Sequence, residues 1–176
     1  CYAQSYIRSR LGGDPHIVTR MQDKAFFEPL SWFEPERINT CSLSDFFHPN
    51  VDESRWQAWE VIQRTIQHQY LICTKRPELI QERFPEDWGN GYPNVALGVT
   101  VENQECIHRI PQLLQVPANL YFVRCEPLLE ELDLSQWLSP PQVSWVICGG
   151  EILRGVKAGD TILDEAGELK ARYSNP

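Results

Sequence analysis

Short apolar runs alternate along the chain with longer segments that mix apolar and polar residues. Most of these runs are apolar at most of their positions, whereas a strand with one face in water would alternate between apolar and polar residues. Such runs are typical of strands in a parallel sheet that is covered on both faces. We predict five strands of this kind, at residues 37–43, 69–74, 94–100, 118–125 and 143–148.

The segments between these runs predict helices. Residues 52–68 carry apolar side chains near helical spacing, and Asp52 is a candidate N-cap. A shorter helix is expected at residues 77–83, which begin with proline, because proline is tolerated in a first helical turn. A third helix is expected at residues 105–114. Strand and helix therefore alternate on the scale of a βαβ unit, about 20 to 30 residues.

Repetition of this unit predicts an α/β domain with (β/α) repeats around a parallel sheet. The sheet is either open or part of a TIM barrel, and five strands are too few to close a barrel of eight. The expected fold is therefore a partial TIM barrel. We assign residues 1–151 to this domain, including a candidate helix at 5–11. Residues 152–176 are expected to form a polar C-terminal tail without a strong strand.

Composition and charge exclude several classes of protein. Hydrophobic residues make up 42% of the chain and charged residues 23%, as in globular proteins. No apolar run reaches the roughly 18 residues that a membrane span needs, and no signal peptide is recognisable. The 24 acidic residues exceed the 16 basic ones, giving a net charge of −8. This balance argues against a broad nucleic-acid-binding surface, because phosphate contacts require clustered lysine and arginine.

The cysteines are dispersed and form no CxxC motif. A chain of 176 residues with a substantial core does not depend on disulfides, so we expect most of the cysteines to be small, buried hydrophobic residues. We expect the protein to be cytoplasmic, where thiols stay reduced. The chain starts with a cysteine rather than a methionine, and we expect further sequence to precede it. The six cysteines are Cys1, Cys41, Cys73, Cys106, Cys125 and Cys148.

Polar residues and glycines follow every predicted strand, at positions where a core would not place them. The carboxyl ends of parallel strands meet at one edge of the sheet, so we predict a site for a cofactor or small molecule there. Cations at this edge suit a carboxylate or phosphate, and a Gly-Gly pair lets the backbone approach a ligand closely. The predicted cofactor-binding residues are Ser42, Ser44, Asp45, Lys75, Arg76, Glu102, Asn103, Glu126, Gly149, Gly150 and Glu151.

Five strings occur in a specific order and spacing. They are SLSDFFHP at 42–49, LICTKRPE at 71–78, LGVTVENQ at 97–104, CEPLL at 125–129 and WVICGGE at 145–151. Together they resemble the phage Gp37/Gp68 family, also called DUF5131. The resemblance runs from Cys1 to about Glu151. Members of this family occur in phages and bacteria.

The family is in turn similar to radical S-adenosylmethionine (SAM) enzymes, which implies a partial TIM barrel of the radical-SAM type. Its members carry three N-terminal cysteines, the last followed by Tyr-Ala, and Cys1 with its two following residues matches that last position. The resemblance therefore implies that Cys1 is a metal ligand, and that the cofactors are a [4Fe-4S] cluster and SAM. It implies reductive cleavage of SAM to a 5′-deoxyadenosyl radical that acts on an unknown substrate.

The resemblance also suggests roles for the strand-end residues. It places Glu151 beside the SAM amino group or ribose, and it places Lys75, Arg76, Glu102, Asn103 and Glu126 around SAM and the substrate. The first two family cysteines have no counterpart in residues 1–176. The later cysteines lack the compact loop spacing of a radical-SAM cluster, so we interpret them as mostly structural.

Two other functions remain open from the sequence. The first is a non-redox α/β protein that binds a nucleotide, SAM or another anionic small molecule. The second is a phage accessory protein that binds a protein partner without catalysis. For the second, candidate interface aromatics are Trp32, Phe33, Trp88 and Trp137. We expect a small-molecule or nucleoside-type substrate, and we expect no association with a membrane.

Overall fold

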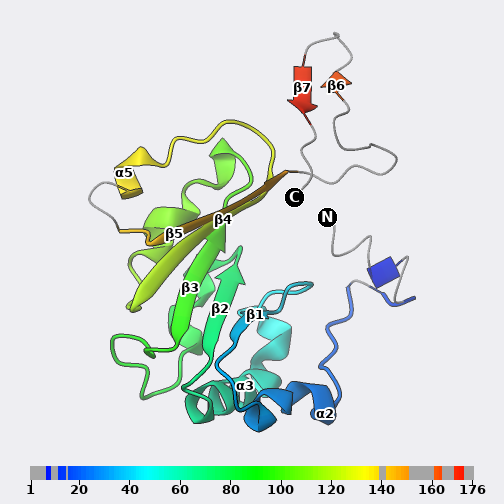
Figure 1. The fold of residues 1–176 in the computed structure, drawn as a ribbon, viewed down its shortest axis with the longest axis vertical. Coiled ribbons are helices and arrows are strands. Elements are labelled where there is room, and N and C mark those ends of the chain that lie inside the picture. The colour runs from blue at the N-terminus through cyan, green and yellow to red at the C-terminus, as the bar shows by residue number, and fades with distance from the viewer. Residues whose placement is uncertain are drawn as a thin grey trace.

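Five parallel strands form one sheet at the centre of the molecule (Figure 1). The computed structural model describes residues 7–8, 12–14, 16–138 and 142–150, and the backbone of residues 161–163 and 169–172. The strand order β1-β2-β3-β4-β5 follows the order along the chain, and every neighbouring pair is parallel. The predicted parallel sheet is confirmed. The strands are β1 (Arg37–Thr40), β2 (Gln69–Thr74), β3 (Val95–Thr100), β4 (Leu120–Leu128) and β5 (Trp145–Gly150).

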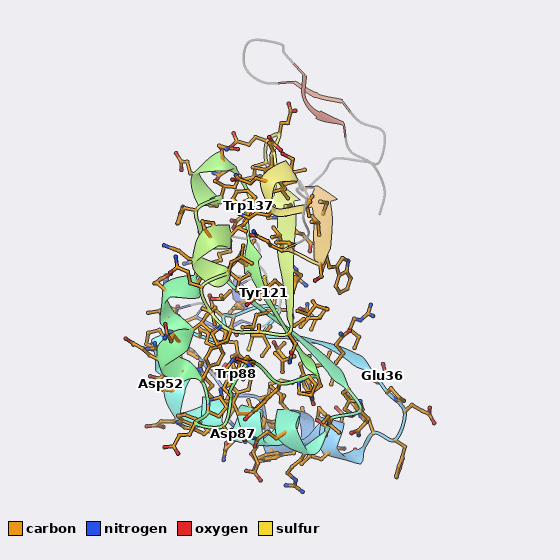
Figure 2. All side chains as sticks on the ribbon, turned by 90° about the vertical axis from the view of Figure 1, so that its left-hand side faces the viewer. Glu36, Asp52, Asp87, Trp88, Tyr121 and Trp137 are labelled. Atoms are coloured by element: carbon orange, nitrogen blue, oxygen red, sulfur yellow. The ribbon has the colours of Figure 1, made fainter. Side chains whose placement is uncertain are left out.

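Short helices connect the strands and lie along one face of the sheet, as the edge-on view in Figure 2 shows. The α-helices are α2 (Asp23–Phe26), α3 (Asp52–Arg64), α4 (Arg109–Leu113) and α5 (Ser135–Leu138). The 3₁₀ turns are η2 (Glu28–Ser31), η3 (Pro49–Val51), η4 (Pro77–Leu79), η5 (Gln81–Arg83) and η6 (Gln104–Cys106). Within the described part of the chain, no helix has the length and apolarity to span a bilayer.

The helices differ from the sequence predictions at their ends. Helix α3 ends at Arg64 rather than at residue 68, because the Thr65 hydroxyl donates to the Val61 carbonyl and the backbone leaves the helical region. Asp52 is the first helical residue and not the N-cap, since its carboxylate pairs with Arg55.

The two later predicted helices are shorter or irregular. Residues 77–83 form two 3₁₀ turns instead of one α-helix. The segment 105–114 begins as a 3₁₀ turn, because the Asn103 side chain accepts a hydrogen bond from the Cys106 amide at 3.1 Å. The α-helix proper then covers only Arg109–Leu113.

The helix-bearing face of the sheet holds the main core. Trp59 of α3 packs among aromatic rings from the following loops, and its indole nitrogen donates to the Arg83 carbonyl at 3.0 Å. The buried strand residues on this face include Ile72, Leu97, Val99, Val123 and Cys125. Trp88 and Trp137 are buried here too (Figure 2), so the expectation that they are exposed interface aromatics is wrong. Of the other two candidates, Trp32 is half-buried and Phe33 is 95% exposed.

The opposite face is concave and packs against itself. Its apolar cluster consists of Leu71, Ala96 and Phe122, with Trp145 and other half-buried side chains around them. We expected the sheet to be covered on both faces, but no helix of the described chain covers this cluster. Curling of the sheet brings side chains of the concave face together and shields them from water.

Contacts across the concave face show how strongly the sheet curls. The Arg37 guanidinium of β1 lies over the Trp145 ring of β5, 5.0 Å from its centroid. An Arg124 amino group of β4 donates to the Asn39 side-chain oxygen of β1 at 3.1 Å. Side chains from the first strand therefore reach those of the last two. The sheet is a curled half-barrel, as the expected partial barrel requires.

The C-terminal part adds a hairpin that the sequence did not predict. Strands β6 (Thr161–Leu163) and β7 (Leu169–Arg172) pair antiparallel. We expected residues 152–176 to lack a strong strand, and these two are only three and four residues long. The candidate helix at 5–11 lies almost entirely outside the described residues, as do Cys1 and Glu151.

Gly98 offers a test of the concave packing. A Cβ at this position would lie 2.4 Å from Cζ of Phe122, its register partner on β4. We expect Gly98→Ala to lower the free energy of unfolding by about 1 to 3 kcal/mol, the usual cost of overpacking a core. Gly150→Ala is the matched control, because its Cβ would meet no atom of the described residues within 4 Å. Urea unfolding of both variants checks the prediction, and equal midpoints would contradict it.

Candidate functional site

The loop after β1 begins the candidate site at the carboxyl edge of the sheet. Cys41 adopts a left-handed backbone conformation with φ of 54°, which turns the chain immediately after the strand. The Ser44 amide then donates to the Cys41 carbonyl at 3.0 Å. Ser42 and Ser44 are both exposed on this turn, and the Ser44 side chain is hydrogen-bonded with Cys41.

Asp45 ties this loop to the end of β2. Its carboxylate accepts hydrogen bonds from the Thr74 hydroxyl at 2.8 Å, the Lys75 amide at 3.1 Å and the Phe47 amide at 3.0 Å. It also pairs with the Arg76 guanidinium at 2.8 Å. Asp45 and Arg76 are therefore brought together as predicted, but they largely satisfy each other and the local backbone.

A second charged group lies between β2, β3 and α4. Glu102, with only 11% of its side chain exposed, accepts from Lys75 and pairs with Arg109 at 2.9 Å. Arg109 also donates to the Thr100 carbonyl at 2.7 Å. Burial, followed by the nearby Arg109 charge, lowers the pKa of Lys75. The Lys75 side chain is about half exposed, so a ligand at this edge can contact it.

Arg109 and Arg124 are candidate site residues that sequence reasoning missed. Arg109 is the first residue of α4 and comes nine residues after Thr100, the last residue of β3, so its position in the sequence did not mark it as a strand-end residue. Arg124 lies near the end of the fourth predicted strand, at 118–125, and is not among the predicted site residues. The structure gives it a central position on the concave face.

The Arg124 side chain is incompletely paired. Its Nε is buried and has no hydrogen-bond partner in the part of the chain that the structure describes. The Glu126 carboxylate lies 4.0 Å from this nitrogen, too far for a hydrogen bond. A buried donor without a partner costs about 1 to 3 kcal/mol. An anionic oxygen of a ligand would satisfy it.

The ends of β4 and β5 lie side by side at the same edge. A Cβ on Gly149 would lie 3.1 Å from Cγ and Oε1 of Glu126, so the glycine leaves that carboxylate its position. Gly150 is exposed, and its Cβ position is open. Asn103, by contrast, uses its side-chain oxygen to cap η6. Glu151 and Cys1 lie outside the described residues, so their predicted roles stay predictions.

The described cysteines do not form a metal centre. Cys73 shares a hydrogen bond of 3.3 Å with the Thr100 hydroxyl, and burial raises the pKa of its thiol. Burial likewise raises the pKa of Cys41. Within the described residues, no group of three or more His, Cys, Asp or Glu side chains is arranged to hold a metal ion.

A pocket of about 300 Å³ lies elsewhere. It is lined by Trp32, Glu36, Arg37 and Ile38. These residues sit at the amino end of β1, and Figure 2 shows Glu36 at the edge of the molecule near this end of the strand. The pocket therefore lies at the end of the strand opposite to the predicted site residues.

The thiol of Cys125 predicts a pH dependence of stability. Burial, followed by the neighbouring Cys148, raises its pKa from the ordinary value of 9.0 to about 11. The unfolded chain therefore loses this proton near pH 9, while the folded chain keeps it to near pH 11. The contribution of the Cys125 thiol to the free energy of unfolding is fully present below pH 9. It decreases as the pH rises to 11, by at most about 2.7 kcal/mol.

Urea unfolding under reducing conditions between pH 8 and 11 measures this dependence. Cys125→Val should flatten the curve relative to the unmodified protein, whereas Cys106→Val should leave it unchanged. Identical curves for the protein and its Cys125→Val variant would contradict the prediction.

Comparisons with known proteins identify one family. A family model described as "Protein of unknown function (DUF5131)" matches residues 1–164. The match extends beyond Glu151, where the resemblance of the sequence strings ended, and reaches the hairpin strand β6. No curated protein and no solved structure matches the chain.

Proposed function

The chain belongs to the DUF5131 family, and from this premise we propose that it is a radical-SAM-like enzyme of the phage Gp37/Gp68 group. The proposed reaction is the reductive cleavage of SAM, dependent on a [4Fe-4S] cluster, to act on a small-molecule or nucleoside-type substrate. The curled half-barrel would then be a partial TIM barrel of the radical-SAM type. We place the protein in the cytoplasm, where cysteines stay reduced.

The unpaired Nε of Arg124 is the observation that carries the proposal. It is a buried cationic donor on the concave face of a parallel sheet, close to the carboxyl edge where ligands of such sheets bind. The carboxylate of the SAM methionyl group would complete its hydrogen bonding. Guanidinium–carboxylate hydrogen bonds are charge-assisted and therefore among the stronger ones.

The other edge residues differ in the hydrogen-bonding capacity that they retain. Glu126 is about half exposed and free to accept from the SAM ammonium group or ribose, a role that we also propose for Glu151. Lys75 is held by Glu102 and presents its ammonium group to an anionic part of the substrate.

Gly149 and Gly150 let the ligand approach the backbone of β5. The exposed hydroxyls of Ser42 and Ser44 can contact the ligand, while Asp45, Arg76 and Asn103 order the loops around it.

The residues present fit SAM better than they fit an iron–sulfur cluster. The described side chains offer no group that could hold three irons. By resemblance Cys1 is one ligand, and the resemblance places two further cysteines beside it in the family. A cluster in this protein would therefore have to be held around Cys1.

Iron and acid-labile sulfide, measured on the full-length gene product after anaerobic reconstitution, test the proposal. We expect roughly four of each per chain, with SAM converted to methionine and 5′-deoxyadenosine after reduction. Cys1→Ala should abolish both, whereas the matched variant Cys106→Ala should keep them. A folded full-length protein that stays free of iron would overturn the proposal.

Arg124 gives a prediction on binding. Arg124→Gln is expected to weaken SAM binding at least tenfold, about 1.4 kcal/mol, because a neutral side chain loses the charge-assisted hydrogen bond. Arg64→Gln is the control, since that arginine is exposed on α3 and pairs only with Glu60. Calorimetry of SAM binding measures both. Equal affinities for both variants, with the fold retained by circular dichroism, would show that Arg124 does not contact the ligand.

A second candidate function is suggested by the cations Lys75 and Arg76 and by the Gly149–Gly150 pair at this edge of the sheet. In it, the edge binds SAM or a nucleotide without any redox step. This alternative would be supported if the protein stays free of iron after reconstitution and still binds SAM or a nucleotide. A catalytically silent protein that binds a partner is the remaining possibility, and it predicts neither iron nor SAM binding.

A further inference from the structure

Two cysteines face each other on neighbouring strands of the sheet. Cys125 of β4 and Cys148 of β5 are register partners. Because side chains at register partners of a parallel pair point to the same face, both thiols lie on the same side. Neighbouring strands are about 4.8 Å apart, which lies within the Cα separations of roughly 4.4 to 6.8 Å that disulfides span.

The two thiols have different environments. Cys125 is 1% exposed and belongs to the core of the helix-bearing face. Cys148 is exposed on β5, an edge strand of the five-stranded sheet. A dissolved oxidant can therefore reach Cys148, while Cys125 is sheltered directly beside it. This arrangement separates an attacking thiol from a resolving thiol.

The other described cysteines have no comparable partner. Cys73 contacts the Thr100 hydroxyl, and alternation along the strand places it on the concave face. Cys41 lies in the loop after β1, and Cys106 lies in η6. The Cys125–Cys148 pair is therefore specific, and the proposed SAM-binding residues do not use either thiol.

We propose that Cys125 and Cys148 form a reversible intramolecular disulfide by exchange with a low-molecular-weight disulfide such as oxidised glutathione. The Cys148 thiolate attacks one glutathione sulfur, forming a mixed disulfide and releasing one reduced glutathione. The Cys125 thiol then loses its proton to solvent and attacks the Cys148 sulfur, which releases the second reduced glutathione. Two protein thiols are oxidised by two electrons, and one glutathione disulfide is reduced to two thiols.

The position of this pair links it to the edge of the sheet. The register between β4 and β5 shifts immediately after Cys125, and Cys148 directly precedes Gly149. A disulfide here would fix the outer strand to its neighbour at the last regular pair before that shift. Glu126 follows Cys125 and Gly149 follows Cys148, and these two residues lie against each other. The disulfide would therefore fix their relative position through the cysteines beside them.

Incubation of the full-length protein in glutathione buffers of increasing oxidised fraction tests the inference. After alkylation and digestion, mass spectrometry is expected to find a linked peptide pair that contains Cys125 and Cys148, and added reductant is expected to remove it. In Cys125→Ala, Cys148 should instead carry glutathione. In Cys148→Ala, Cys125 should stay unmodified. Cys106→Ala is the matched control and should keep the linked peptide.

Two results would overturn the inference. One is the absence of the linked peptide in the most oxidising buffer while circular dichroism shows a folded protein. The other is a Cys148–glutathione adduct that persists in the unmodified protein, because it would show that Cys125 does not resolve it. Neither readout depends on iron or SAM, so this test can fail or succeed independently of the proposed enzyme activity.

Discussion

Replacing Trp59 with alanine is expected to lower the free energy of unfolding by about 3 to 5 kcal/mol, the usual cost of removing a large aromatic side chain from a core. Trp59 is 2% exposed, and its ring centroid lies 4.9 Å from that of Phe46 and 5.3 Å from that of Trp88. The substitution would leave a cavity between α3 and the loops, and it would leave the Arg83 carbonyl without its indole donor.

Trp56 provides the control on the same helix. It is 55% exposed, so Trp56→Ala should change stability by no more than about 0.5 kcal/mol. Urea unfolding followed by circular dichroism measures both variants, because the remaining tryptophans complicate fluorescence. A Trp59→Ala midpoint as close to that of the unmodified protein as the Trp56→Ala midpoint would contradict the described core.

Replacing Glu102 with glutamine is expected to cost about 3 to 4 kcal/mol, toward the lower end of the range for breaking a buried ion pair. The Glu102 carboxylate is the counter-charge of both Arg109, which is largely buried, and Lys75. A neutral amide would leave both cations without it. Lys75 is 48% exposed, so water can compensate its ammonium group in part, and this moderates the loss.

Glu105→Gln is the matched control for the Glu102 substitution, since Glu105 is an exposed carboxylate in the same loop. Denaturant unfolding at neutral pH compares the two, and a loss in Glu102→Gln no larger than in Glu105→Gln would refute the buried ion-pair interpretation. Adding Lys75→Met to Glu102→Gln should recover part of the stability, because it removes one of the two uncompensated cations.

The parallel sheet could be predicted because its apolar runs carry the information locally. Residues 69–74 and 95–100 are mostly apolar and become neighbouring strands in parallel register. Helix lengths were less predictable. The short helix after β3 depends on the Asn103 cap, which competes with α-helix formation at the start of the segment.

The shape of the sheet could not be read from the pattern. An apolar strand face is the same whether helices cover it or the sheet curls around it. The contact of Arg37 with Trp145 joins residues more than a hundred positions apart, and no local signal announces it. Trp88 and Trp137 similarly become buried only because the loop that carries Trp88 and the short helix α5 that carries Trp137 fold onto the helix-bearing face.

The candidate site could be located in outline but not in its internal pairings. Parallel topology alone places Asp45, Lys75, Glu102 and Glu126 at one edge. Which carboxylate meets which cation depends on register and loop length, so the Asp45–Arg76 and Glu102–Arg109 pairs emerged only from the structure. Arg124 was underestimated because an arginine at a strand end usually reaches solvent, whereas this one points across the concave face to β1.

The sequential strand order has a consequence for how the protein is made. Each strand of the sheet pairs with the strand that precedes it in the chain, so no strand has to be inserted between two that are already paired. During synthesis, β1 and β2 can associate before β3 leaves the ribosome, and each later strand finds its template already formed. Every strand pairing needed for the half-barrel is therefore available in the order of translation, which limits the time that an unpaired apolar strand spends exposed to aggregation.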